Sequence, residues 1–159
     1  MFYHIVHYHP FISTFVDTRT PVCIIVARTA ERRVIGGLFS SQSAAKEGES
    51  AVIAVHSAGE WAKKWQSHTQ SNKLMIIDFA ASWCGPWRSI EPAIKEMSAR
   101  FTNAVFLKVD VDELPEVSKQ WKVQAMPTFV LVKRGQEVGR IVGTKKEELQ
   151  RTIQLHLNM

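Results

Sequence analysis

The stretch Leu74–Trp87, which reads LMIIDFAASWCGPW, decides the fold. It begins within a nearly continuous apolar run, Lys73–Ala80, which is typical of a central strand that is covered on both faces. The segment Ser82–Arg88 then predicts a turn that leads into a helix, because the residues after it place an apolar stripe at helical spacing. The stripe consists of Ile90, Ala93, Ile94, Met97 and Phe101. A single cysteine, Cys84, therefore lies between a buried strand and an amphipathic helix.

On both sides of this stretch, short apolar runs alternate with the start signals of helices. Four further strands are expected at Ala51–His56, Ala104–Asp110, Thr128–Lys133 and Glu137–Val142. Three further helices are expected to begin at the side-chain caps Ser57, Asp112 and Thr144. The resulting order, β-α-β-α-β-α-β-β-α, predicts an α/β domain. Its central mixed sheet would be flanked by helices, with parallel neighbours from the strand–helix–strand units and an antiparallel hairpin at one edge.

The chain changes character about a third of the way along. Ser40–Ser50, SSQSAAKEGES, is small and polar and has no apolar periodicity, which is typical of a linker. We therefore divide the chain into an N-terminal extension with its linker, residues 1–50, and a domain at residues 51–159. The extension holds the apolar pieces Phe11–Val16 and Val22–Ala27, but it lacks the basic start and the unbroken apolar stretch of a secretory signal. We expect it to be poorly ordered.

Composition excludes several classes of protein. The chain has 159 residues, of which 45% are hydrophobic and 22% charged, so it is neither a disordered nor a collagen-like chain. No apolar run approaches the roughly 20 residues that a membrane-spanning helix needs. The net charge of +5 is spread over interleaved acids and bases, so nucleic acid is not an expected partner. Two cysteines cannot form a disulfide framework, which favours a reducing compartment.

The cysteine segment carries a resemblance to a known family. IDFAASWCGPW, followed about 40 residues later by AMPTF, is similar to the thioredoxin family, and the likeness covers residues 51–157. The segments LMIIDFAASWCGPW and VFLKVDVDELPEVSKQW most resemble plant h-type thioredoxins. This resemblance implies a thioredoxin-like fold and a thiol–disulfide oxidoreductase that acts on protein disulfides in cell redox homeostasis. Neither the resemblance nor the residues themselves require a metal or an organic cofactor.

Two residues carry chemistry on physical grounds. Cys84 stands at a helix start, where free backbone N–H groups and the helix dipole stabilise a thiolate and lower its pKa below the free value of about 8.5. Asp78 lies six residues earlier on an otherwise apolar strand, where desolvation would raise its pKa and suit it to proton transfer. The thiolate is the nucleophile in disulfide exchange. We therefore expect Cys84 to attack disulfide sulfur, and the resemblance assigns the proton to Asp78.

The resemblance also assigns roles to residues further along the chain. Lys108 matches the family's lysine near that carboxylate, and Pro127 matches the cis-proline whose loop faces the active cysteine and pairs with the backbone of bound substrate. Trp83, Met126 and Gly143 match the family's apolar docking rim, although Trp83 and Met126 are also compatible with ordinary core packing. The expected substrate-binding residues are Trp83, Gly85, Pro86, Trp87, Met126, Pro127 and Gly143.

One position departs from the family pattern. The family motif is Trp-Cys-Gly-Pro-Cys, and its last position is Trp87 here. The missing second cysteine is the resolving thiol, which attacks the mixed disulfide and frees the substrate. The leading prediction is therefore a monothiol oxidoreductase, in which an outside thiol such as glutathione releases the mixed disulfide at Cys84. Cys23, the other thiol, lies in the extension, and a bridge from it to Cys84 is not the expected state. Trp87 either crowds the site or adds a binding surface.

A second hypothesis is a non-catalytic binding or trapping module that descends from a degenerate gene copy. Trp87 favours it, and so does Gly36–Ser40, which fits the tail of an N-myristoylation motif but follows Ile35 instead of Met. Gly36 can be acylated only if the residues before it are removed, so membrane association depends on that removal. A cytoplasmic location is otherwise expected, and organelle targeting by residues 1–35 stays open.

Overall fold

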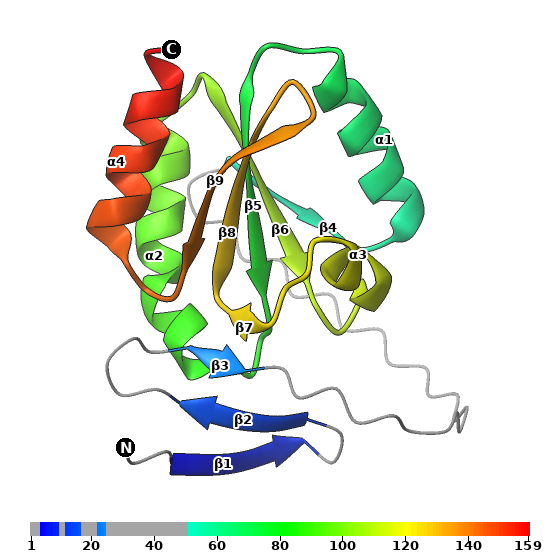
Figure 1. Cartoon of the computed structure of the whole chain (residues 1–159), viewed down its shortest axis with the longest axis vertical. Coiled ribbons are helices and arrows are strands. Elements are labelled where there is room, and N and C mark those ends of the chain that lie inside the picture. The colour runs from blue at the N-terminus through cyan, green and yellow to red at the C-terminus, as the bar shows by residue number, and fades with distance from the viewer. Residues whose placement is uncertain (1–3, 10–11, 17–21, 25–50) are drawn as a thin grey trace.

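The computed structural model describes residues 4–9, 12–16, 22–24 and 51–159, and these form two sheets and four helices (Figure 1). The larger sheet lies wholly in the domain at residues 51–159. The smaller sheet joins strands of the extension to a short strand of the domain. Within the described residues, no helix is long and apolar enough to cross a membrane.

The larger sheet has the strand order β4-β6-β5-β8-β9. Its strands are β4 (Val52–Val55), β5 (Leu74–Ala80), β6 (Ala104–Asp110), β8 (Thr128–Lys133) and β9 (Gln136–Val142). The central strand, β5, is parallel to β6 and antiparallel to β8, and β8 and β9 form a hairpin. The mixed sheet that the sequence predicts is confirmed, and each strand ends within one residue of its expected bounds.

Helices cover both faces of this sheet, as expected. They are α1 (Ala58–Thr69), α2 (Gly85–Arg100), α3 (Pro115–Gln120) and α4 (Lys146–Leu157). Figure 1 shows α2 and α4 together on one side of the sheet and α1 and α3 on the other. The smaller sheet lies beyond the end of β5 at which α2 begins (Figure 1).

The core follows from the alternation of side chains along β5. All seven residues of this strand are buried, because successive side chains point to opposite, covered faces. Met75, Ile77 and Phe79 join the apolar cluster that includes α1 and α3 residues. Leu74 and Ile76 join the cluster that includes α2 and α4 residues. The continuous apolar run in the sequence thus corresponds to a strand with two buried faces.

The predicted helix caps agree with the structure in one case of three. The Ser57 Oγ accepts a hydrogen bond from the Glu60 N–H of α1 at 3.2 Å, as the capping box predicts. The predicted caps Asp112 and Thr144 are wrong, because neither α3 nor α4 has a side-chain cap. Pro115 begins α3 instead, since its ring fixes φ and it has no N–H group to leave unpaired.

The smaller sheet has the order β1-β2-β3-β7. Its strands are β1 (His4–His9), β2 (Ile12–Val16), β3 (Cys23–Ile24) and β7 (Ala125–Met126). β3 runs antiparallel to β7 and pairs Cys23 with Met126 and Ile24 with Ala125 (Figure 1). Three strands of the extension are among the described residues, and β3 pairs with the domain strand β7. Gly36 and the linker lie outside the described residues.

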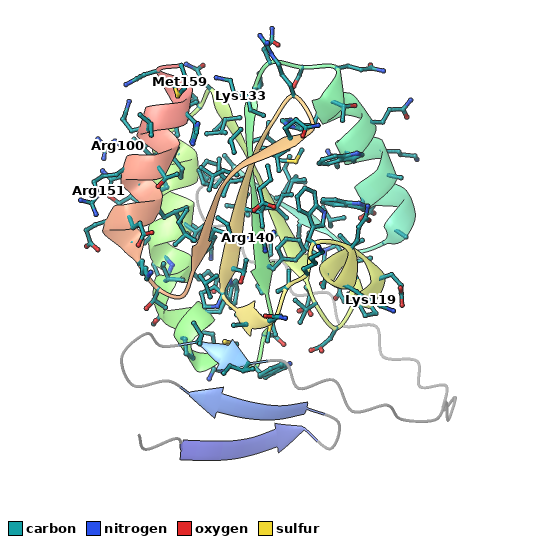
Figure 2. The ribbon with its side chains drawn as sticks, viewed as in Figure 1. Arg100, Lys119, Lys133, Arg140, Arg151 and Met159 are labelled. Carbon is teal, nitrogen blue, oxygen red and sulfur yellow. The ribbon has the colours of Figure 1, made fainter. Side chains whose placement is uncertain are left out.

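Basic side chains come from separate elements of the domain. Figure 2 shows Arg100 and Arg151 on the side of α2 and α4, with Lys119 on the opposite side in α3. Arg140 lies on β9, where its Nη2 is 2.8 Å from the Glu137 carboxylate. The positive charges that Figure 2 labels are therefore distributed over the domain, and at least one of them is paired.

Candidate active site

Cys84 lies at the junction of β5 and α2, as the sequence predicts. It is the N-cap residue of α2, which begins at the next residue, so the helix starts within the predicted turn Ser82–Arg88. The Cys84 N–H donates to the Ala81 carbonyl at 3.0 Å, and the Arg88 N–H donates to the Cys84 carbonyl at 3.1 Å. Pro86 fits the first turn because its φ is already helical. Cys84 therefore meets the unpaired N–H groups and the positive end of the helix dipole.

The loop before β8 faces Cys84. The Met126–Pro127 peptide bond is cis, which is the geometry that the resemblance implies. The Cys84 Sγ donates a weak hydrogen bond to the Met126 carbonyl at 3.7 Å. The Gly143 N–H donates to the Pro127 carbonyl at 2.8 Å, and Gly143 has a φ of 91°, which favours glycine. These four residues therefore meet where β7 passes into β8.

Trp83 borders the same place. Its ring is partly buried against the apolar cluster that holds Cys84, and its Nε1–H donates to the Asp112 Oδ2 at 2.7 Å. Asp112, which the sequence predicts as a helix cap, thus bonds Trp83 and lies two residues before Leu114, the N-cap residue of α3. Gly85 is exposed and Pro86 is half-buried, so both form the surface beside the cysteine.

Asp78 belongs to a second cluster, one helical turn along α2 from Cys84. Asp78 is 3% exposed, and burial raises the pKa of its carboxyl to about 7 against the opposing effects of Trp87 and Lys108. The Trp87 Nε1–H donates to the Asp78 Oδ2 at 3.0 Å. The Oδ1 atom has no hydrogen-bond partner among the described residues. Asp78 is thus bonded to Trp87, and the structure shows no hydrogen bond between Asp78 and Cys84 within its described part.

Trp87 is the last residue of the WCGPW motif and lies in the first turn of α2. Its side chain is 3% exposed, so it packs inside the domain instead of presenting a surface. The Lys108 Nζ lies 4.0 Å from the centroid of the Trp87 ring, which is a cation–π distance. Asp78 and Lys108 are paired across β5 and β6, so one tryptophan ring contacts both members of that pair. A small cavity beside it is lined by Val52, Asp78, Trp87, Glu91, Ile94, Lys95 and Lys108.

The structure brings to the site one residue that the sequence does not assign to it. Cys23, on β3, is 4% exposed and lies in the same apolar cluster as Cys84 and Met126. The two thiols are close enough for Cys23 to donate a hydrogen bond to the sulfur of Cys84. The available sequence signal is the apolar piece Val22–Ala27 around this cysteine. Nothing in that piece indicates which surface of the domain it covers.

Contact between the thiols shifts their pKa values in opposite directions. The pKa of Cys84 is lowered chiefly by the hydrogen bond from Cys23, with smaller contributions from the Trp87 N–H and from Arg88, while burial opposes the shift. The pKa of Cys23 is raised by the neighbouring Cys84 and by burial. Of the two thiols, Cys84 is therefore the one that loses its proton more readily.

Fold and site together define a class of protein. A mixed sheet covered by helices on both faces, with a low-pKa cysteine at a helix start opposite a cis-proline loop, is the arrangement of a thiol–disulfide oxidoreductase with a thioredoxin-like fold. The family model described as Thioredoxin matches residues 53–155, and the chain belongs to the thioredoxin family.

Plant h-type thioredoxins are similar to this chain. Thioredoxin H2-1 of Oryza sativa subsp. japonica is 56% identical over 124 residues, which cover 75% of this chain and 90% of the relative. Thioredoxin H2 of Arabidopsis thaliana is 49% identical over 121 residues, or 76% of this chain and 91% of the relative. The crystal structure of thioredoxin NaTrxh from Nicotiana alata matches with a TM-score of 0.69 and 50% identity, covering 71% of this chain and 98% of that one. The predicted resemblance to the h-type is confirmed.

Proposed function

We propose that this protein carries out thiol–disulfide exchange on protein substrates with Cys84 as the only thiol of its WCGPW motif. The placement of Cys84 carries the proposal. Its sulfur lies at the start of α2, its pKa is lowered, and it contacts the Met126 carbonyl beside the cis peptide bond. A thiolate in this position attacks a disulfide whose peptide is held at the cis-proline loop.

The first step joins substrate to enzyme. The Cys84 thiolate attacks one sulfur of a substrate disulfide, forms a mixed disulfide and expels the other sulfur as a thiolate. We propose that an extended substrate segment pairs with the backbone of β7 in place of β3, because a strand edge binds peptide main chain through ladder hydrogen bonds. Trp83 and Gly143 flank this edge and provide its apolar rim.

The second step needs a thiol from outside the motif. Trp87 has no sulfur to attack the mixed disulfide, and its N–H group occupies Asp78, the carboxylate that the resemblance assigns to proton transfer. We propose that Asp78 acts as a positioning residue, holding Trp87 and through it the first turn of α2. Glutathione is the external thiol that we propose as a partner, since it attacks accessible mixed disulfides directly.

Reduction of insulin disulfides at neutral pH tests this function. Wild type, Cys84→Ser and Trp87→Cys are compared, first with dithiothreitol and then with glutathione as the reductant. We expect wild type to exceed Cys84→Ser with glutathione, because only wild type forms the mixed disulfide at this position. We expect Trp87→Cys to be active with both reductants, since it restores a dithiol motif.

The contrary result is clear. If Trp87→Cys is active while wild type matches Cys84→Ser under both reductants, the wild-type protein does not reduce disulfides. Binding or trapping of partners then becomes the working model.

A binding or trapping module is the second candidate, and the burial of Cys84 favours it. This thiol is 0% exposed, because Met126 and β3 cover it. Alkylation of Cys84 in the wild-type chain, followed by peptide mass mapping over a range of pH, separates the candidates. Rapid labelling near neutral pH supports the enzyme, and labelling only above about pH 8.5, the value of a free thiol, supports the module.

The location of the protein is a separate proposal that rests on the sequence. We propose a cytoplasmic protein, because two cysteines in 159 residues suit a reducing compartment. Membrane association would require a mature N-terminus at Gly36 that carries an acyl chain, and targeting to an organelle would require removal of part of residues 1–35. The mass of the N-terminal peptide, measured on protein from its native cells, distinguishes these three states.

A further inference from the structure

The extension binds to the domain as a peptide strand. β3 pairs antiparallel with β7, so that Cys23 lies opposite Met126 and Ile24 lies opposite Ala125. β7 ends at the residue before the cis peptide bond, on the backbone where we place the substrate. β3 of the same chain therefore occupies the edge of β7 where we place the substrate, and the linker joins β3 covalently to the domain.

This pairing places a second thiol against the first. Cys23 and Cys84 are both buried, at 4% and 0% exposure, and both belong to the apolar cluster that contains Met126. Met126 is the strand partner of Cys23 and, through its carbonyl, the hydrogen-bond partner of the Cys84 Sγ. Both cysteines are free thiols, and each shifts the pKa of the other. Resolution of a mixed disulfide at Cys84 requires a second thiol nearby, and the WCGPW motif does not contain one.

We propose that Cys23 is the resolving thiol of this protein, supplied by the extension strand that pairs with β7 beside Cys84. The proposal rests on the proposed function, in which Cys84 attacks substrate disulfides. It replaces glutathione by a thiol of the same chain in the second step only.

The chemistry balances in two exchanges. In the first, Cys84 forms a bond to one sulfur of the substrate disulfide, and the other sulfur leaves as a thiolate. In the second, Cys23 loses its proton and attacks the Cys84 Sγ, so that a Cys23–Cys84 disulfide forms and the remaining substrate sulfur leaves and takes up a proton. Two electrons have then passed from the two cysteines to the substrate. Two molecules of an external thiol such as glutathione return the pair to the reduced state and become one disulfide.

β3 must leave β7 when a substrate docks. It must return when Cys23 resolves the mixed disulfide at Cys84. The ladder between β3 and β7 is two residues long, whereas β5 and β6 pair over seven. A ladder as short as this one is displaced by an incoming peptide at a small cost in hydrogen bonds. Because the linker keeps it attached, Cys23 stays near Cys84 at an effective concentration on the order of millimolar.

The test follows the fate of a glutathione adduct in the full-length chain. Reduced wild type and Cys23→Ser are treated with oxidised glutathione, and aliquots are quenched with acid for intact mass and for peptide mapping without reduction. In wild type we expect a transient adduct at Cys84, then a product that has lost two hydrogens and yields a linked peptide containing both cysteines. In Cys23→Ser we expect the adduct to decay at least about tenfold more slowly, because no millimolar in-chain thiol is present.

A matched control moves the thiol by one residue. The double variant Cys23→Ser, Ile24→Cys keeps two cysteines, but successive strand residues point to opposite faces, so its new thiol faces away from Cys84. We expect its adduct to persist as in Cys23→Ser. Cys23→Ala serves as a second replacement that introduces no hydroxyl group, and a rate independent of protein concentration shows that closure occurs within one chain.

Each outcome has one meaning. A persistent Cys84 adduct in wild type, equal to that in Cys23→Ser, overturns the resolving role and leaves the proposed function standing. Closure of the displaced-thiol variant as fast as wild type also overturns the proposal, because the position of Cys23 on β3 would then be irrelevant. Absence of any adduct or disulfide at Cys84 in every variant shows instead that the proposed function fails.

Discussion

The surroundings of Cys84 and those of Trp87 form two regions at the start of α2, and they differ in their contacts. Cys84 faces the Met126 carbonyl and the cis peptide bond, and its pKa is lowered. Trp87, three residues later, contacts Asp78 and Lys108. The first region places a cysteine beside the cis peptide bond, whereas the second holds a tryptophan that packs in the core, donates a hydrogen bond and makes a cation–π contact. The second and the last residue of the WCGPW motif therefore depend on different sets of contacts.

The largest expected effect distinguishes packing from chemistry. Trp87→Ala should lower the free energy of unfolding by about 3–5 kcal/mol, because it removes a buried aromatic side chain and leaves a cavity. Cys84→Ala should cost much less stability and should remove the adduct that oxidised glutathione forms at position 84. Urea unfolding followed by circular dichroism measures the first quantity, and intact mass measures the second.

Trp83→Ala is the matched control for this comparison. Trp83 is also a tryptophan near the start of α2, but it is only partly buried, so its removal should cost less than that of Trp87. Equal losses at the two positions would show that Trp87 is not a core residue of the second region, and that the contrast between the two regions is mistaken.

The next effect is the pH dependence that Asp78 brings to stability. Its folded pKa is raised to about 7, above an unfolded value of about 4, so the native state holds a proton that the unfolded state releases. This contribution is fully present below about pH 4 and is lost as pH rises through about 7, with a total of roughly 4 kcal/mol. Urea unfolding measures the free energy of unfolding of wild type and Asp78→Asn between those pH values. As pH rises, any advantage of wild type over the variant should shrink or reverse.

Glu116→Gln controls for the loss of any carboxylate, because Glu116 is exposed on α3. Its stability should follow that of wild type across the same range of pH. A stability difference between wild type and Asp78→Asn that stays constant with pH would mean that Asp78 does not titrate as a buried carboxyl.

Much of the fold was predictable because its signals are local. The seven buried residues of β5 read as one apolar run, and the Ser57 cap and the hairpin of β8 and β9 depend on neighbouring residues. The cap predicted at Asp112 failed because its carboxylate bonds the Trp83 side chain, 29 positions away. A local pattern cannot show that a side chain has a distant competitor.

Local signals also predict some residues of the candidate site, whereas others depend on distant contacts. Cys84 and Asp78 were predictable, since a cysteine at a helix start and an acid on an apolar strand are visible in sequence. The partner of Trp87 was not, because spacing does not give the direction of an indole ring. Cys23 was the hardest to predict, since within the described residues β3 joins the domain through a two-residue ladder to Ala125 and Met126, far along the chain.

The smallest effect concerns the cation above Trp87. Lys108→Met should lower the free energy of unfolding by about 0.5–2 kcal/mol through loss of the cation–π contact. The same change removes a positive charge that lowers the pKa of Asp78, so that pKa should rise further and the pH-dependent loss of stability should move to higher pH. Urea unfolding at several pH values measures both changes.

Lys95→Met provides the comparison, because Lys95 lines the same small cavity but is an exposed residue paired with Glu91 at 3.5 Å. This exposed pair contributes little, so the variant should leave both the stability and its pH profile near those of wild type. If Lys95→Met shifts the pH profile of stability as far as Lys108→Met does, the overall positive charge sets the pKa of Asp78. The Trp87 ring then does not couple Asp78 to Lys108. If only Lys108→Met shifts it, the second region acts as one unit in which lysine, indole and carboxyl hold one another in place.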